Sequence, residues 1–193
     1  MRRAFRRLLD HCVLLGLTAA SFGTQAQGIY VAAGAGASQW GMDCGSSGCD
    51  RSATALRLAA GYRFNRVIAL EAFQLDLGRA RSSSNMIDGE LRSRGTGVET
   101  ILGGQIGDVE LAGKIGLASM RNDFRAAPSS FDPSERRTRT EVIFGAMLAY
   151  RFTPQLALRF DLDFVTVALN GDFIFYSRGA DVSTLTMGLA YRF

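Results

Sequence analysis

One short pattern recurs along this chain at nearly constant intervals. Tyr62-Arg63-Phe64 is repeated as Tyr150-Arg151-Phe152 and as Tyr191-Arg192-Phe193, and Gly103-Gly104-Gln105-Ile106 is a weaker copy. The copies end at residues 64, 106, 152 and 193, so they lie 42, 46 and 41 residues apart. Such a period predicts an array of similar units. Each unit has room for two strands, a tight turn and a longer loop, so four units predict eight strands.

The hydrophobic pattern indicates strands rather than helices. In Gln155–Phe164 every second residue is apolar, and Arg159, Asp161 and Asp163 fall strictly between. A helix would scatter these charges around its circumference, whereas a strand sorts them onto one face. The same alternation predicts strands at residues 54–64, 98–106, 142–152 and 185–193, and a weaker form predicts them at 67–77 and 111–119. Residues 28–40 are rich in Gly and Ala, and their two faces cannot be told apart.

The connections between these strands alternate in length. Residues 65–66, 107–108 and 153–154 are short and contain turn-forming residues. The other connections are long and polar, at about residues 41–52, 79–94, 121–139 and 166–180. Short turns on one rim and long loops on the other are expected of outer-membrane barrels, and the rim with the short turns faces the periplasm.

Alternation alone does not say which face of the barrel points outward, and a soluble barrel such as a lipocalin would turn its apolar face inward. Two features favour a membrane barrel. The polar face interleaves charges with very small residues, which suits a crowded lumen. Tyr62, Tyr150 and Tyr191 lie on the apolar face beside the short turns, as in an interfacial aromatic girdle. We therefore predict an eight-stranded antiparallel up-and-down transmembrane β-barrel with short periplasmic turns and long extracellular loops.

Residues 1–26 are predicted to be a cleaved signal peptide, which leaves residues 27–193 as one barrel domain. Four Arg in the first seven residues precede an apolar stretch, and Thr24-Gln25-Ala26 reads as a cleavage site. The leader takes four Arg and one Asp from totals of 22 and 18, so 18 basic and 17 acidic residues remain. The net charge falls to +1, which gives no reason to expect a nucleic-acid partner.

Cys44 and Cys49 are the two cysteines beyond the leader. In an exported protein such a pair predicts a disulfide. A zinc site is the alternative, but two thiols with no nearby His do not supply four ligands.

The chain resembles the family of small outer-membrane barrels typified by the N-terminal domain of outer membrane protein A. The resemblance is carried by Cys49-Asp50-Arg51-Ser52, Gly61-Tyr62-Arg63-Phe64-Asn65, Ala69-Leu70-Glu71 and Leu75-Asp76-Leu77-Gly78. It implies a barrel in a Gram-negative outer membrane, inserted by the barrel assembly machinery, with Tyr191 and Phe193 of the last strand as its recognition signal. Nothing follows Phe193, so a peptidoglycan-binding domain, and with it a cell-wall tether, is not implied.

Twelve charged residues are expected to point into the lumen. They are Arg57, Arg63, Lys114, Arg151, Arg159 and Arg192, with Glu71, Glu99, Glu110, Glu141, Asp161 and Asp163. An eight-stranded barrel is just wide enough for side chains to fill, and unpaired buried charge is unfavourable. We expect these groups to pair across a solid polar core; a narrow or gated ion path is the alternative.

No catalytic, metal-binding or cofactor-binding residue is predicted. The single His, His11, lies in the leader, which excludes Ser-His and Asp-His arrangements from the remaining chain. Asp161 and Asp163 lie beside Arg159, which favours structural pairing over acid–base chemistry. A lipid-A-modifying barrel enzyme is therefore a weak alternative.

The long loops are the best candidates for function. Five Arg of the third loop could contact lipopolysaccharide phosphates, since guanidinium groups suit phosphate; they are Arg121, Arg125, Arg136, Arg137 and Arg139. A solvated basic loop is the alternative. The predicted function is a non-enzymatic outer-membrane protein with an envelope-structural role, or one that contacts a surface or host ligand through its loops.

Overall fold

A computed structural model describes residues 27–41, 49–84, 87–127, 135–167 and 180–193. It contains eight long strands and one short strand, β2. Their bounds are β1 Gly28–Gly41, β2 Cys49–Asp50, β3 Ser52–Arg63, β4 Ile68–Ser84, β5 Ile87–Ile106, β6 Val109–Ala127, β7 Glu135–Arg151, β8 Leu156–Val167 and β9 Ala180–Arg192. In these residues no helix is both long and apolar enough to cross a membrane.

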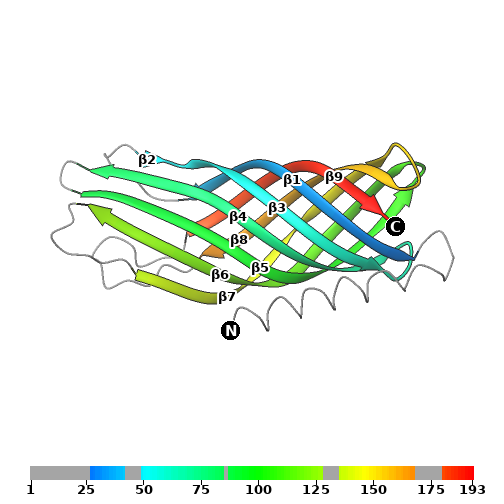
Figure 1. The fold of residues 1–193 in the computed structure, drawn as a ribbon, viewed down its shortest axis with the longest axis horizontal. Coiled ribbons are helices and arrows are strands. Elements are labelled where there is room, and N and C mark those ends of the chain that lie inside the picture. Colours follow the sequence, from blue (N-terminus) through cyan, green and yellow to red (C-terminus); the bar gives the residue numbers. More distant parts are fainter. Residues whose placement is uncertain (1–26, 42–48, 85–86, 128–134, 168–179) are drawn as a thin grey trace, which may run out of the picture.

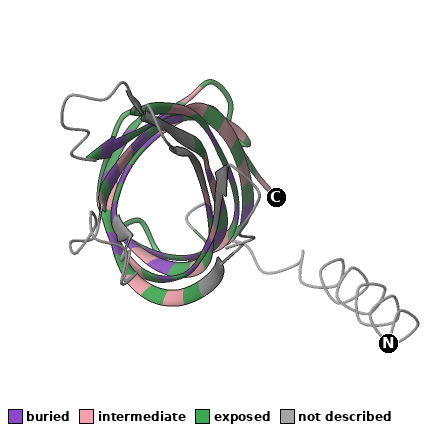
Figure 2. Cartoon of the chain, turned by 90° about the vertical axis from the view of Figure 1, so that its left-hand side faces the viewer, coloured by how far each residue is buried: buried purple, intermediate pink, exposed green. Residues whose placement is uncertain are grey.

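The eight long strands form one closed antiparallel barrel. β1 lies between β3 and β9, successive strands pair from β3 through β9, and β2 adds to the outer end of β4. The tilted strands are visible in Figure 1, and the end-on view of Figure 2 shows the closed ring. Closure pairs the backbone amides that lipid cannot satisfy. The predicted eight-stranded barrel is confirmed.

The apolar face of the barrel points outward. Leu58, Leu111 and Phe144 are 57%, 64% and 54% exposed, whereas Arg57 and Glu71 on the inner face are 3% and 0% exposed. Figure 2 shows bands of buried and exposed positions along the ribbons of the strands. The large exposed apolar side chains therefore face hydrocarbon, and the predicted orientation is confirmed.

The rim that carries the short turns, here the turn rim, closes with local hydrogen bonds. The Asn65 side-chain oxygen accepts from the amides of Val67 and Ile68, both at 2.8 Å. The Thr153 hydroxyl oxygen accepts from the amide of Leu156 at 3.0 Å. Gly107, in the turn between β5 and β6, has φ +60°, a conformation that favours glycine.

At the opposite rim, the loop rim, the strands are longer than predicted. Most of residues 79–94 and 121–139, predicted as loops, belong to β4, β5, β6 and β7. The prediction failed there because above the lipid both faces of a strand are polar, so alternation disappears although the backbones still pair. A bulge between Asp76 and Arg79, with Gly78 at φ +75°, interrupts β4 at this boundary.

Three predictions fall wholly or partly outside the described residues. The leader, residues 1–26, and Cys44 lie there, and only the backbone of Cys49 is described, where it pairs with Ser82. The signal peptide and the Cys44–Cys49 disulfide therefore stay predictions. Most of the fourth long connection, from residue 168 to 179, is outside the described ranges as well.

Candidate functional site: the charged lumen and its two rims

Seven of the charged residues predicted to face the lumen meet in one buried cluster, here the ionic layer. It consists of Arg57, Glu71, Glu99, Lys114, Arg159, Asp161 and Asp163. These residues come from β3, β4, β5, β6 and β8, which lie on different sides of the barrel. The side chains therefore span the lumen rather than lining one wall.

Glu71 is the most heavily bonded carboxylate of the ionic layer. Arg159 donates to both of its oxygens, at 2.6 and 3.0 Å, and Arg57 donates at 3.0 Å. The Tyr30 hydroxyl donates a further hydrogen bond at 2.8 Å. Arg159 also forms two bonds to Asp161, both at 2.8 Å. Such two-pronged guanidinium–carboxylate contacts are the strong form of this interaction.

The other half of the ionic layer is organised around Lys114 and Arg57. The Lys114 ammonium lies 2.7 Å from Asp161 and 2.6 Å from Asp163. Arg57 donates to Glu99 at 2.7 Å and to Asp163 at 3.0 Å. Three cations thus face four carboxylates, and every one of the seven groups has an oppositely charged partner.

Small residues make room for these long side chains. Gly188 on β9 lies opposite Arg159 on β8. A Cβ atom at Gly188 would overlap the Ala33 carbonyl oxygen of β1, so the backbones approach there as only glycine allows. Arg57 also stacks over the ring of Phe73, with its guanidinium carbon 4.6 Å from the ring centre.

On the loop-rim side of the ionic layer the lumen is apolar, which was not predicted. The large side chains of this apolar layer are Trp40, Phe73, Leu75, Leu77, Met120, Ile143, Val165 and Val182. Trp40 is only 2% exposed, and its indole nitrogen donates to Ser38 at 3.2 Å. One hint of this layer was present in the sequence, because the weakly alternating segment 67–77 has apolar residues on both faces.

Four other predicted residues lie at the turn rim, and this group is here the mouth cluster: Arg63, Glu110, Arg151 and Arg192. Arg63 and Glu110 form an ion pair. Among the described residues, no carboxylate pairs with Arg151 or Arg192. The twelfth predicted residue, Glu141, is half-buried on the inner face of β7 and has no ion pair with a described residue.

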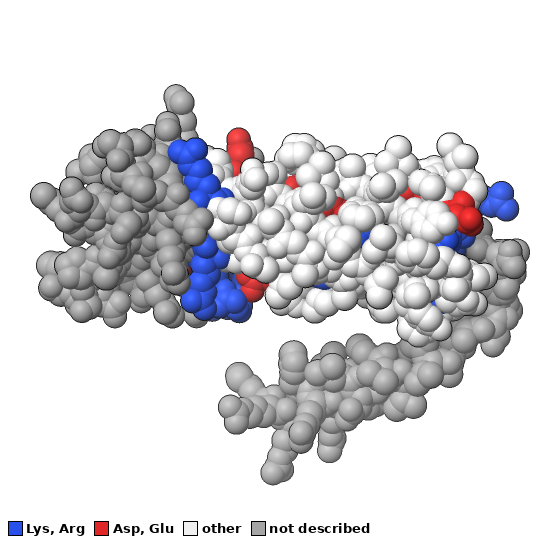
Figure 3. Space-filling view, turned by 90° about the horizontal axis from the view of Figure 1, so that it is seen from above, with Lys and Arg blue, Asp and Glu red and all other residues white. Residues whose placement is uncertain are grey.

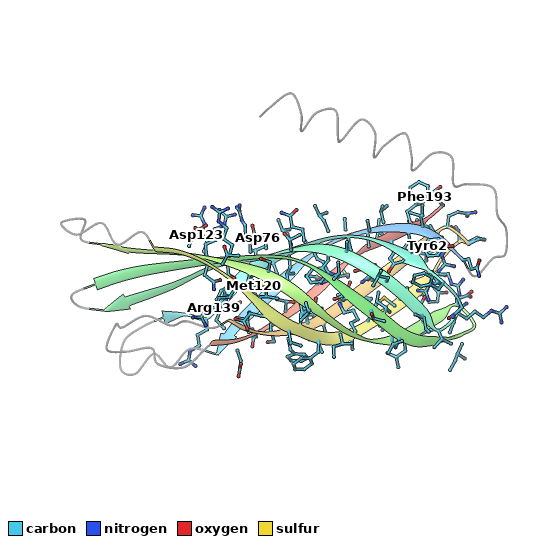
Figure 4. All side chains as sticks on the ribbon, turned by 90° about the horizontal axis from the view of Figure 1, so that it is seen from below. Tyr62, Asp76, Met120, Asp123, Arg139 and Phe193 are labelled. Carbon is cyan, nitrogen blue, oxygen red and sulfur yellow. The ribbon has the colours of Figure 1, made fainter. Side chains whose placement is uncertain are left out.

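The loop rim carries a band of arginines on the outer wall of the barrel. This arginine band consists of Arg79, Arg92, Arg94 and Arg121 on β4, β5 and β6. Figure 3 shows basic side chains gathered next to the loop end, beside a wall that is almost free of charge. Arg92 and Arg94 each bond to Asp76 at 3.0 Å, and Arg121 lies 3.9 Å from Asp123. Asp76 and Asp123 lie close to this rim in Figure 4.

The arginines predicted for the third loop do not act as one group. Arg121 points outward from β6 and belongs to the arginine band. Arg139 lies on the inner face of β7, opposite the fully buried Met120, and both are labelled in Figure 4. Arg125, Arg136 and Arg137 have strand backbones, but their side chains are outside the described part of the structure. The prediction of a single loop cluster is therefore wrong for Arg139, because its strand turns it inward.

The described residues contain no group of three or more His, Cys, Asp or Glu that could hold a metal ion. The carboxylates of the ionic layer are instead held by Arg57, Lys114 and Arg159. Acid–base chemistry needs a carboxylate that can reach a substrate, and these four are enclosed within the barrel.

A known protein family has the architecture described above. The profile of the OmpA-like transmembrane domain covers residues 24–193. The chain belongs to the OmpA-like transmembrane domain family. Members are outer-membrane barrels, so this chain is a multi-pass barrel of a Gram-negative outer membrane.

Solved structures with the same fold are distant in sequence. The attachment invasion locus protein Ail of Yersinia pestis, solved in complex with the heparin analogue sucrose octasulfate, is 20% identical over 86% of this chain and 99% of its own, with a TM-score of 0.56. Neisserial surface protein A is 18% identical over 86% and 97%, with a TM-score of 0.58. A major outer membrane protein of Thermus thermophilus is 13% identical over 86% and 99%, with a TM-score of 0.61. No curated protein sequence matches this OmpA-like chain significantly.

Proposed function

We propose that this OmpA-like barrel is a non-enzymatic envelope protein whose lumen is a solid structural core and whose loop rim binds polyanions of the cell surface. The arginine band is the observation that carries this proposal. It places four guanidinium groups on the outer wall where the apolar surface ends, and among the side chains described there only two carboxylates, Asp76 and Asp123, lie beside them.

Lipopolysaccharide phosphates are the proposed polyanion. They lie at the boundary between hydrocarbon and sugar in the outer leaflet, at the height where the exposed apolar wall gives way to the band. Arginine forks match phosphate geometry. The sulfated ligand in the Ail structure supports the idea that a barrel of this fold can hold a polyanion, and it leaves a sulfated host surface as a second source for the same chemistry.

The proposal is tested by lipopolysaccharide retained during purification in mild detergent. The double variant Arg94→Ala/Arg121→Ala should lose most of the bound lipid A phosphate measured by mass spectrometry. Arg66→Ala is the matched control, since Arg66 is an exposed arginine of the turn rim. Equal retention by all three proteins would overturn the proposed contact.

A conducting pore is the alternative that the lumen argues against. An ion would have to pass the ionic layer and then the apolar layer, where Trp40 and Met120 are buried. Apolar constrictions resist ion passage because they cannot replace hydration. We expect no discrete conductance steps when the purified chain is added to a planar bilayer; reproducible steps that disappear on denaturation would favour the pore.

A lipid-modifying enzyme is disfavoured on the same grounds. The buried carboxylates already have cationic partners, and the sequence has no His beyond His11. Expression should therefore leave the lipid A mass spectrum of the host unchanged.

Tyr191 and Phe193 are proposed as the contact for the barrel assembly machinery. Both side chains point outward, at 46% and 73% exposure, and their rings meet edge to face at 5.1 Å. Replacing both with Ser should reduce the amount of assembled barrel in outer membranes, whereas Tyr62→Ser, which changes an equivalent girdle residue, should not.

A further inference from the structure

The repeated Tyr-Arg-Phe motif builds two different structures at the turn rim. In each copy the outer residues form an aromatic pair on the lipid side, with ring centres 5.1, 5.2 and 5.1 Å apart. The middle residue points the other way, because side chains alternate along a strand. The repeat therefore delivers Arg63, Arg151 and Arg192 from β3, β7 and β9 to the same end of the lumen.

These three arginines line one cavity. Its volume is about 40 Å³, and Glu110, Gln155 and, at its inner end, Arg159 of the ionic layer also border it. A single water needs roughly 10–15 Å³ by the same measure, so the cavity has room for a group of a few heavy atoms. Figure 4 places the labelled aromatic residues Tyr62 and Phe193 at this end of the barrel.

The charges around the cavity do not balance. Glu110 is paired with Arg63, which leaves Arg151 and Arg192 without a carboxylate among the described residues. The Nε and one terminal nitrogen of Arg151 are buried and have no hydrogen-bond acceptor among the residues that the structure describes. Arg63 and Arg151 repel the Arg192 guanidinium, and this repulsion is larger than the attraction that Glu110 exerts on it. Converging guanidinium groups with unused donors are the complement of an anion with several oxygens.

We propose that this cavity is a binding site for a small oxyanion, a carboxylate or a phosphate group, that enters from the periplasm. The arginines lie on the lumen face of their strands, so headgroups of lipids outside the wall do not reach them. Two periplasmic sources share this chemistry: free phosphate or phosphate esters, and the carboxylates of peptides. The proposal does not depend on the lipopolysaccharide contact, which involves the opposite rim.

The test uses the full chain folded in uncharged detergent micelles. Inorganic phosphate and succinate are titrated separately at constant ionic strength, and the arginine side-chain Nε–H resonances are followed by NMR. We expect saturable shifts with at least one of them. Arg151→Gln and Arg192→Gln should each weaken binding about tenfold, as for a lost charge-assisted hydrogen bond, while Arg66→Gln on the same rim should not weaken it.

The outcomes show whether the site binds an oxyanion and which of the two kinds it prefers. Saturation with phosphate alone assigns phosphate groups, and saturation with succinate alone assigns carboxylates; both support the site. Shifts that never saturate, or an equal loss in Arg66→Gln, overturn it, because they indicate only general attraction between charges. Heat-dependent gel migration verifies that each variant is folded. If a Gln variant does not fold, Arg→Lys at the same position keeps the charge but loses the planar fork, and it should still weaken binding.

Discussion

The ionic layer and the mouth cluster are built from the same residue types on the same face of the barrel, yet they balance their charges differently. In the ionic layer three cations face four carboxylates, and Arg159 alone makes four hydrogen bonds to Glu71 and Asp161. In the mouth cluster there are three arginines and one carboxylate, Glu110, which pairs with Arg63. This difference in charge balance corresponds to a difference in access to water. Charges enclosed in the barrel need partners, whereas charges beside an open cavity can be hydrated or can bind a ligand.

Removing Arg159 should have the largest effect. Arg159→Met would leave Glu71 and Asp161 in the lumen without their two-pronged partner. Breaking a buried pair from one side costs about 3–5 kcal/mol, so we expect the free energy of unfolding to fall by that amount. Urea titration of the barrel in detergent, followed by gel migration, measures it. A loss below about 1 kcal/mol would mean that the ionic layer is hydrated like the mouth, and the contrast between the two regions would fail.

Glu99→Leu should have a smaller effect. Glu99 bonds to Arg57 at 2.7 Å and lies 3.7 Å from Lys114, but both cations keep other carboxylates. The variant leaves three cations facing three carboxylates. We expect a loss of about 1–3 kcal/mol, the usual cost of leaving one buried donor without its partner, and a lower temperature for the heat-induced gel shift. A loss as large as that of Arg159→Met would contradict this ranking, because neither the balance of charges nor the number of bonds made by Glu99 predicts it.

The apolar layer tests whether the lumen is packed like a protein core. Ile143→Val removes one methylene from a side chain that is 1% exposed and should cost about 0.5–1.5 kcal/mol. Val165 on β8 is the residue paired with Ile143 on β7. Adding Val165→Ile restores the total volume, so the double variant should recover part of the loss in the same urea titration. No recovery would mean that the two side chains do not share one packed space.

Most of this fold could be predicted from the sequence, and the failures have a common physical cause. Alternation assigns each residue to a face, so the eight strands, the outward direction of the girdle residues Tyr62 and Tyr150 and the inward direction of Arg159 could be predicted. It does not give height along the barrel axis, because height depends on how each strand is shifted against its neighbour. The sequence therefore did not predict which of the charged residues lie in the ionic layer and which lie in the mouth cluster.

Two groups of residues were missed because alternation did not reveal their strand or their face. Tyr30 bonds to Glu71 but lies in the Gly/Ala-rich segment 28–40, where the faces could not be distinguished. Arg92 and Arg94 lie in a stretch predicted as a loop, because polarity on both faces hides strand periodicity above the lipid. The arginine band forms because strand pairing places Arg94 opposite Asp76 on β4 and opposite Arg121 on β6. This register is known only from the paired strands.

The smallest expected effect provides the sharpest comparison. Arg192→Met removes the same charge, from the same face, as Arg159→Met. Because Arg192 has no carboxylate partner among the described residues and is repelled by Arg63 and Arg151, we expect the free energy of unfolding to change by no more than about 0.5 kcal/mol in buffer without phosphate or carboxylate ions. Adding inorganic phosphate should then stabilise the unmodified barrel more than the variant, since a ligand that binds only the folded state raises its stability. A loss of several kcal/mol in phosphate-free buffer would show that Arg192 is held by the barrel itself, leaving it unavailable to an anion.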